Sequence, residues 1–198
     1  MLSTRTRFLR DPSLRTTGAE AVSQVEAWIQ SFSPVDLAGL LDEACITLLS
    51  NVFSRVGGCE GTVWLRDQAE NLTAVYNSGE NADSLVGFEQ PIGSGIISMV
   101  FAQQQPYCEN SIQASAGHDD TLDRKISKHT SSMIAVPFYF GFGLRGVVSC
   151  VQLDEEEAKG KEGFSSDDVA ELSRVTCVVE RLVNESLLTS VLGLNDAG

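Results

Sequence analysis

Two apolar runs on either side of a glycine-containing turn constrain the fold of this chain more than any other feature. The first run covers 133–140 and the second covers 143–153. Both are rich in β-branched, aromatic and other apolar residues, and Gly141 and Gly143 flank the turn between them. Runs of this kind around a short turn are typical of an antiparallel hairpin. The sequence therefore predicts a hairpin over this region.

A long helix is expected to follow the hairpin after a charged loop. Ser165 or Ser166 can cap it, with Asp167 and Asp168 in its positive first turn, and it should end near residue 192. Residues along it recur at near-heptad spacing: Val169, Leu172, Val175, Val179, Leu182, Ser186 and Leu187. This seam, together with the length of the helices, predicts a homodimer, because two-fold dimers are the commonest oligomers.

Two further helices are expected near the N-terminus. Helical spacing of apolar residues predicts the first over 19–31, and Pro34 is suited to the first turn of the second. The second helix, over 34–55, carries one apolar stripe: Leu37, Leu40, Leu41, Ala44, Cys45, Leu48, Leu49, Val52 and Phe53. Residues 1–18 are expected to form a disordered basic tail and 193–198 a second tail, which leaves a domain over 19–192.

The remaining elements complete an α+β pattern. Strands are expected at 59–66, 71–76, 86–91 and 106–109, a helix at 96–104, and a polar loop at 111–131. This order predicts a central antiparallel sheet of five to six strands with the long N- and C-terminal helices on one face. The opposite face is then expected to hold a pocket roofed by helix 96–104 and loop 111–131.

Two motifs identify a family resemblance that covers roughly residues 33–190. One is the hairpin followed by the acidic loop, Gly163-Phe-Ser-Ser-Asp-Asp168 and the long helix. The other is Gln90-Pro-Ile-Gly-Ser-Gly-Ile-Ile-Ser-Met-Val100 followed by Gln105-Pro-Tyr-Cys-Glu-Asn110. Together they resemble the GAF domain of the GAF/PAS-like sensory superfamily. The resemblance implies a signal-sensing scaffold with the same sheet, helices and pocket.

Composition and charge exclude several classes of function. The chain has 198 residues and a net charge of −13, and residues 1–15 contribute +3, so the rest carries −16. Such a surface repels phosphate backbones and anionic lipid, so neither nucleic acid nor membrane is an expected partner. The five cysteines are dispersed and show no C-x-x-C spacing. We therefore expect no zinc site or disulfide framework, and a reducing cytoplasmic location.

The expected ligand site lies between the hairpin and helix 96–104. Met133 and Ser149 should form its floor, Ile97, Met99 and Phe101 its roof, and Tyr107, His118 and His129 its rim. An apolar cavity with a few polar groups suits a small heterocycle better than a multiply charged phosphate. His118 and His129 stay open between a binding role and an exposed, non-functional one. The two histidines have no third ligand at a motif spacing, so no metal site is predicted.

Individual residues bear on two specific activities that the family resemblance suggests. Cys108 invites comparison with the free methionine sulfoxide reductases, which are thiol enzymes of the GAF fold, but 109–132 contains no cysteine to resolve a disulfide. The cyclic-nucleotide motif is only half present: Phe164 and Asp168 match it, whereas Asp154-Glu155 stands in place of Asn-Lys. The sequence favours a non-enzymatic sensor of a small organic ligand with a downstream signalling partner. The alternatives are a ligand-free dimerisation or docking module and, less favoured, the thiol enzyme.

Overall fold

The computed structural model describes residues 12–31, 33–80, 82–112, 129–154 and 163–192. Its centre is one six-stranded sheet with the order β3-β2-β1-β6-β5-β4. Every neighbouring pair is antiparallel. The strands are β1 (Glu60–Arg66), β2 (Asn71–Asn77), β3 (Glu89–Pro91), β4 (Tyr107–Glu109), β5 (Thr130–Phe140) and β6 (Gly143–Leu153). The predicted α+β fold with an antiparallel sheet of five to six strands is confirmed.

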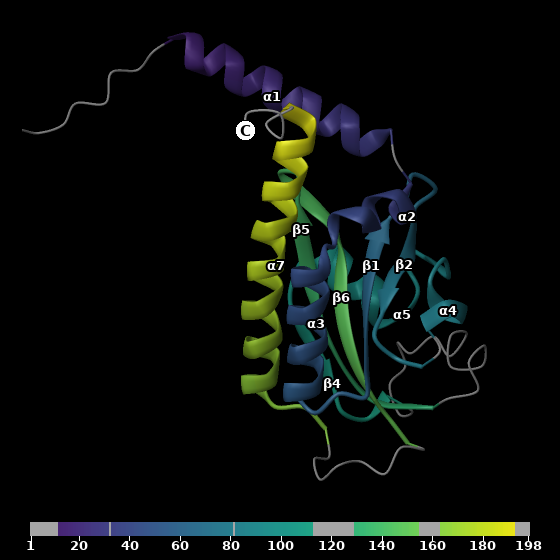
Figure 1. Cartoon of the computed structure of the whole chain (residues 1–198). Coiled ribbons are helices and arrows are strands. Elements are labelled where there is room, and N and C mark those ends of the chain that lie inside the picture. The colour runs from purple at the N-terminus through teal and green to yellow at the C-terminus, as the bar shows by residue number, and fades with distance from the viewer. Residues whose placement is uncertain (1–11, 32, 81, 113–128, 155–162, 193–198) are drawn as a thin grey trace, which may run out of the picture.

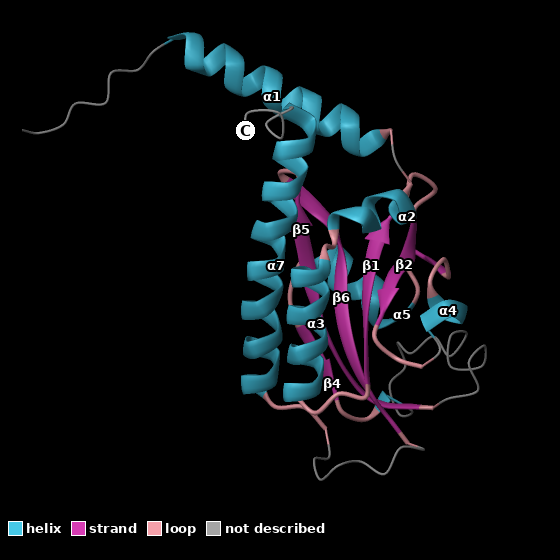
Figure 2. Cartoon of the chain, viewed as in Figure 1, coloured by secondary structure: helices cyan, strands magenta, loops and turns pink. Residues whose placement is uncertain are grey.

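The helices occupy both sides of this sheet. They are α1 (Pro12–Gln30), α2 (Pro34–Leu37), the 3₁₀ turn η1 (Ala38–Leu40), α3 (Glu43–Arg55), α4 (Ala82–Leu85), α5 (Gly95–Gln103) and α7 (Ser166–Leu192). In Figure 1, α3 and α7 lie side by side on one face, and α1 crosses the C-terminal end of α7. Figure 2 shows the layers by secondary structure: two long helices, the sheet behind them, and α5 on its far side.

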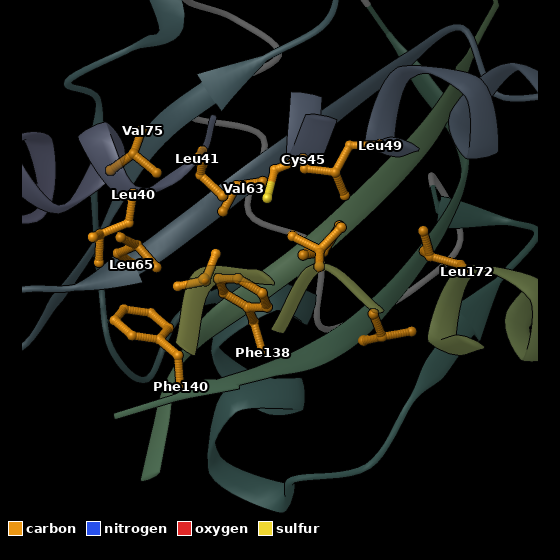
Figure 3. Packing of buried hydrophobic residues seen from close by; sticks show 14 of the residues in the cluster. Leu40, Leu41, Cys45, Leu49, Val63, Leu65, Val75, Phe138, Phe140 and Leu172 are labelled. Atoms are coloured by element: carbon orange, nitrogen blue, oxygen red, sulfur yellow. The ribbon is translucent and has the colours of Figure 1, made fainter. Parts of the chain in front are cut away.

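The main core fills the space between the sheet and the helices α3 and α7. Strands contribute Val63, Leu65, Val136 and Phe138, and the helices contribute residues such as Leu172, all buried. Figure 3 shows side chains of this core, among them Val63, Leu65 and Leu172, and the rings of Phe138 and Phe140 pack next to one another. We call this side of the sheet the helix face. Burial of its apolar residues is the main source of stability of the fold.

The expected single helix over 34–55 is wrong, because the chain bends at Leu41 and Asp42. Leu41 has ψ 83°, outside the helical region, and Asp42 starts α3 by accepting a 2.8 Å hydrogen bond from the backbone N–H of Cys45. The two parts, Pro34–Leu40 and Glu43–Arg55, are inclined by 95°. Both bury their apolar residues in one core, so the periodic stripe continues across the break. Among the described residues no single helix is long and apolar enough to span a membrane, and this bent pair passes the same length and composition test only when both parts are joined.

The expected boundary of the N-terminal tail is wrong for residues 12–18, which belong to α1. Val25 and Ile29 are buried and anchor the C-terminal half of α1 to the core. Extending an anchored helix backwards costs little, and proline is well suited to the first helical position, where Pro12 lies. The rest of the expected tail, 1–11, and the tail at 193–198 lie outside the described residues.

The start of α7 resolves the choice between Ser165 and Ser166 in favour of Ser165. The backbone N–H of Asp168 donates to Ser165 Oγ at 3.3 Å, and the backbone N–H of Ser165 donates to Asp168 Oδ2 at 2.7 Å. This reciprocal pair is a capping box with aspartate in the third position. Further along, Arg55 of α3 forms an ion pair with Glu171, which ties the two long helices together.

The β5–β6 turn is held by hydrogen bonds to α7. Gly141 and Phe142 both have positive φ, 53° and 65°, as a two-residue hairpin turn of this twist requires. The backbone N–H groups of Tyr139 and Gly141 donate to Glu180 Oε1 and Asn184 Oδ1 of α7, each at 2.8 Å. These bonds occupy donors at the upper end of β5, where an open strand edge would otherwise invite pairing with another chain.

Candidate functional site

A second apolar cluster lies on the opposite side of the sheet, which we call the second face. Its buried members are Trp64, Leu72, Ala74, Ile96, Ile97, Val100, Ile112, Met133, Ala135 and Val147. Helix α5 packs there against β5 and β6. Half-buried residues surround this cluster: Phe88, Ile92, Met99, Phe101, Tyr107 and Val151. The second face therefore has an apolar centre and a rim of apolar and aromatic side chains that still reach solvent.

Five of the eight residues expected at the ligand site belong to this cluster. Ile97 and Met133 are buried in it, and Met99, Phe101 and Tyr107 are half-buried around it. They come from α5, β4 and β5: β4 and β5 are neighbours in the sheet, and α5 packs against β5.

The other three expected residues stand differently. Ser149 is buried on the neighbouring strand β6 and bonds to Trp64 of the cluster. His129 is exposed just before β5 and is not part of the cluster. His118 lies outside the described residues.

Trp64 is the residue at the candidate site that sequence reasoning missed. It is 1% exposed at the centre of the second face, and its indole N–H donates to Ser149 Oγ at 3.0 Å. Its ring meets that of Phe88 edge-on, with centroids 6.4 Å apart. Strand alternation indicates that Trp64 and Val63 point to opposite faces, but not which face each occupies.

A buried polar row runs beside the apolar centre. Thr62 on β1 is directly opposite Ser149 on β6 and Asn77 on β2. Asn77 Nδ2 donates to Thr62 Oγ1 at 2.9 Å, and Asn77 Oδ1 accepts the backbone N–H of Gly79 at 2.7 Å. Because the oxygens of Ser149 and Thr62 already accept bonds, their hydroxyl hydrogens can donate. The second face thus combines an apolar centre with a short row of hydroxyl and amide groups.

Charged groups on this side lie at its margins. The guanidinium of Arg66 lies 6.0 Å from the ring centroid of Phe101, within reach of a cation–π contact, and it pairs with Glu70 at 3.5 Å. The hydroxyl of Tyr107 donates to Glu109 Oε2 at 3.2 Å. Burial and this bond raise the pKa of Tyr107, so the phenol is held in its protonated, donating form. Among the described residues of the second-face cluster and its rim, none carries a charge.

Cys108 lies on β4 but packs against the helix-face core, not the second face. Its sulfur donates weakly to the carbonyl oxygen of Phe164 at 3.6 Å. Burial, followed by the nearby carboxylates of Glu109 and Asp168, raises the pKa of the Cys108 thiol. A raised pKa leaves little thiolate at neutral pH, which is the opposite of what a thiol nucleophile needs.

The other cysteines and possible metal ligands give no alternative centre in the described part of the chain. Burial raises the pKa of Cys45 to about 12 and raises that of Cys150. None of the five cysteines, all of which are described, is in a disulfide. No group of three or more His, Cys, Asp or Glu side chains that could hold a metal ion occurs among the described residues.

Comparison with known proteins identifies the fold. No family model matches the chain, and no curated protein matches it. A solved GAF domain/HD domain protein from Geobacter sulfurreducens matches at 15% identity and a TM-score of 0.58, covering 76% of this chain and 97% of the other. The GAF domain of a phosphoenolpyruvate-protein phosphotransferase from Coxiella burnetii matches at 13% identity and 0.59, covering 89% and 96%.

A free methionine-R-sulfoxide reductase from Neisseria meningitidis, solved with its substrate, also shares this architecture. It matches at 18% identity and a TM-score of 0.56, covering 95% of this chain and 99% of the other. GAF domains and a reductase therefore share one arrangement of strands and helices, and likeness at this level identifies the scaffold alone. The chain has the fold of a GAF domain.

Proposed function

We propose that this protein is a regulatory GAF-like module that binds a small organic ligand on the second face of its sheet and signals through its helices. The observation that carries the proposal is the separate second-face cluster. A sheet whose helix face already supplies the main core has a second apolar surface with half-buried aromatic residues at its rim. Small-molecule sites are mostly apolar clefts with a few fixed polar groups, and the second face supplies side chains of both kinds.

The composition of the second face supports a small, mostly apolar heterocycle as the ligand. Phe101 and Tyr107 offer aromatic surface, and the hydroxyls of Ser149 and Thr62 offer hydrogen bonds. Arg66 at the margin is partly satisfied by Glu70. A multiply charged phosphate would need several unpaired cations or backbone N–H groups, so it fits this surface less well.

A ligand-free dimerisation or docking module is the second candidate. The observation that favours it is the pair of exposed apolar residues on the outer helices, Ile46 of α3 at 37% and Val178 of α7 at 43%. A second copy packed across α3 and α7 would cover both. In the sensor proposal the same contact between α3 and α7 of two copies forms a homodimer, and the homodimer binds a downstream signalling protein.

Thiol reductase chemistry is the third candidate, and the state of Cys108 argues against it. The thiol needs a low pKa and an accessible partner thiol, whereas the pKa of Cys108 is raised by burial and two carboxylates. We therefore propose a non-enzymatic role. The absence of disulfides among the five cysteines supports a reducing, cytoplasmic location within the same proposal.

A thermal-shift screen tests the proposal against both alternatives. The panel contains nucleobases, cyclic nucleotides, aromatic metabolites and methionine sulfoxide. A hit that is lost in Tyr107→Ala and Met99→Ala, and kept in Val178→Ala on the outer helix face, supports the second-face site. A hit insensitive to the two rim variants argues against it, and silence across the panel favours the dimerisation module. Turnover of methionine sulfoxide that disappears in Cys108→Ser would overturn the non-enzymatic role.

A further inference from the structure

The short strand β4 connects the two faces of the sheet. Tyr107 belongs to the second-face cluster, and the next residue, Cys108, packs against the helix-face core. β4 is only three residues long, and among the described strands it pairs with β5 alone, at the end of the sheet. Short edge strands have few hydrogen bonds to hold them, so they open at lower cost than central strands. A change at Tyr107 is therefore able to move β4 without disturbing the centre of the sheet.

Asn110, directly after β4, binds the backbone of Phe164 through both ends of its side-chain amide. The N–H of Phe164 donates to Asn110 Oδ1 at 2.7 Å, and Asn110 Nδ2 donates to the carbonyl oxygen of Phe164 at 2.9 Å. The side chain of Asn110 therefore forms the two hydrogen bonds that the backbone of a neighbouring strand would otherwise form. Gly163 permits this approach, because it has φ 74° and a Cβ there would lie 2.8 Å from Asn110 Oδ1.

Gln152 of β6 holds the same segment by a separate contact. Its Oε1 accepts the N–H of Gly163 at 2.9 Å, and its Nε2 donates to the carbonyl oxygen of Gly57 at 2.9 Å. Two side-chain amides, one directly after β4 and one in β6, therefore fix the two residues before the Ser165 cap of α7. We call Asn110, Gln152, Gly163 and Phe164 the amide latch. Asn110 follows the short edge strand that carries Tyr107, whereas Gln152 follows Val151 of the rim on the central strand β6.

We propose that the amide latch is the coupling element of this module: occupation of the second face near Tyr107 moves β4, and Asn110 passes that movement to the N-terminus of α7. The inference rests on the proposed sensor function and names its internal route. Only two residues separate Tyr107 from Asn110, and one separates Phe164 from the first residue of α7. The route bypasses the central strands, whose paired hydrogen bonds resist displacement.

A double-mutant cycle tests this route without any ligand. The variants are Tyr107→Ala, Asn110→Ala and their combination, and the readout is hydrogen exchange of the backbone amides of 164–172. Asn110→Ala should speed exchange there about tenfold, because two hydrogen bonds to Phe164 are lost. Tyr107→Ala should also speed it when Asn110 is present. In the Asn110→Ala background it should add less than about twofold, since the coupling is already broken.

A second readout is the alkylation rate of Cys108, whose sulfur contacts Phe164, with the exposed Cys177 as an internal control. The rate at Cys108 should follow the exchange data and the rate at Cys177 should not change. Asn184→Ala removes a similar amide contact at the other end of α7 and should leave 164–172 unaffected. Should Asn110→Ala fail to fold, Asn110→Asp keeps an acceptor for the N–H of Phe164 and removes only the donor, so a smaller effect of the same kind is expected.

Additive effects of Tyr107→Ala and Asn110→Ala, or an α7 that does not respond to Tyr107→Ala, would overturn the coupling role. Because the cycle is run on the unliganded protein, its result is independent of the ligand screen. If the protein binds a ligand but the two substitutions have additive effects, the sensor function stands and the coupling role of the amide latch is wrong. If the protein shows the coupling but binds nothing in the panel, the coupling role of the amide latch stands and the proposed ligand class is wrong.

Discussion

The indole N–H of Trp64 donates a 3.0 Å hydrogen bond to the hydroxyl of Ser149 across the β1–β6 pair, and both side chains are buried. Ser149→Ala should therefore leave a buried donor unpaired and lower the free energy of unfolding by about 1–3 kcal/mol. Urea denaturation measures the change. Ser190→Ala is the control, because that hydroxyl is exposed and donates to the carbonyl oxygen of Ser186 in its own helix. Equal stability of the two variants would mean that the Trp64–Ser149 bond contributes nothing to the fold.

Val178 is the exposed apolar residue of α7 best placed to report on dimerisation. It is 43% exposed, whereas Leu182 of the expected seam packs partly against the core, so a charge at Leu182 would disturb folding as well as assembly. If a second copy covers α3 and α7, Val178→Glu should convert a dimer to a monomer, because it buries an unpaired charge. Light scattering at high micromolar concentration measures the mass. Val35→Glu on α2 is the control and should leave the mass unchanged.

Asp42 caps α3, and its hydrogen bond from the backbone N–H of Cys45 holds the pKa of the carboxyl below its ordinary 3.8. The charged form is thus favoured by folding, so its contribution is complete above pH 3.8 and is lost as pH falls through the folded pKa. Asp42→Ala should lower the free energy of unfolding by about 1 kcal/mol at neutral pH, and the difference in stability from wild type should become smaller in acid. Asp42→Asn keeps an uncharged cap and should stay close to wild type at neutral pH. A gap that widens on acidification would contradict this account.

Glu180 is the opposite case, because burial raises the pKa of its carboxyl above the ordinary 4.5 although the N–H of Tyr139 bonds to it. Its charged form is disfavoured by folding, so the protein loses stability as pH rises from below 4.5 to above the folded pKa. Glu180→Gln keeps an acceptor for Tyr139 without the charge. We expect it to be more stable than wild type by a few tenths to about 1 kcal/mol at neutral pH and equal to it below 4.5. Chemical denaturation of both proteins at several pH values measures how this difference in stability changes with pH.

Phe142 stores backbone strain at the hairpin turn, where it is 62% exposed and has φ 65°. A side chain in this conformation costs roughly 1–2 kcal/mol, and the added flexibility of glycine costs about 0.5–1 kcal/mol. Phe142→Gly should therefore stabilise the protein by about 0.5–1 kcal/mol in a thermal or urea unfolding experiment. Phe142→Ala keeps the Cβ and should give no such gain. A gain of the same size from alanine would assign the effect to the exposed ring instead of the backbone.

Local patterns were sufficient for the elements whose signals are contained within one segment. Alternation and the turn glycines predicted β5 and β6, and the serine–aspartate cap predicted the start of α7. The same patterns indicated that one sheet face is covered by helices and that α5 lies on the other. These predictions succeeded because the chemistry of each element is local: side-chain period, capping and turn conformation depend on residues a few positions apart.

Tertiary structure alone decided the features that depend on distant partners. The apolar stripe of 37–53 is the same for a straight helix as for two short ones, and the bend at Asp42 follows from wrapping both parts around one core. Likewise, nothing near Trp64 indicates that Ser149, 85 residues away, will accept its N–H. Nothing near Asn110 indicates that it will bind Phe164, 54 residues away. The sequence determined which segments are helices and strands, because those preferences are local. The fold decided which side chains meet, because a buried polar group takes its partner from whatever the packing brings within reach.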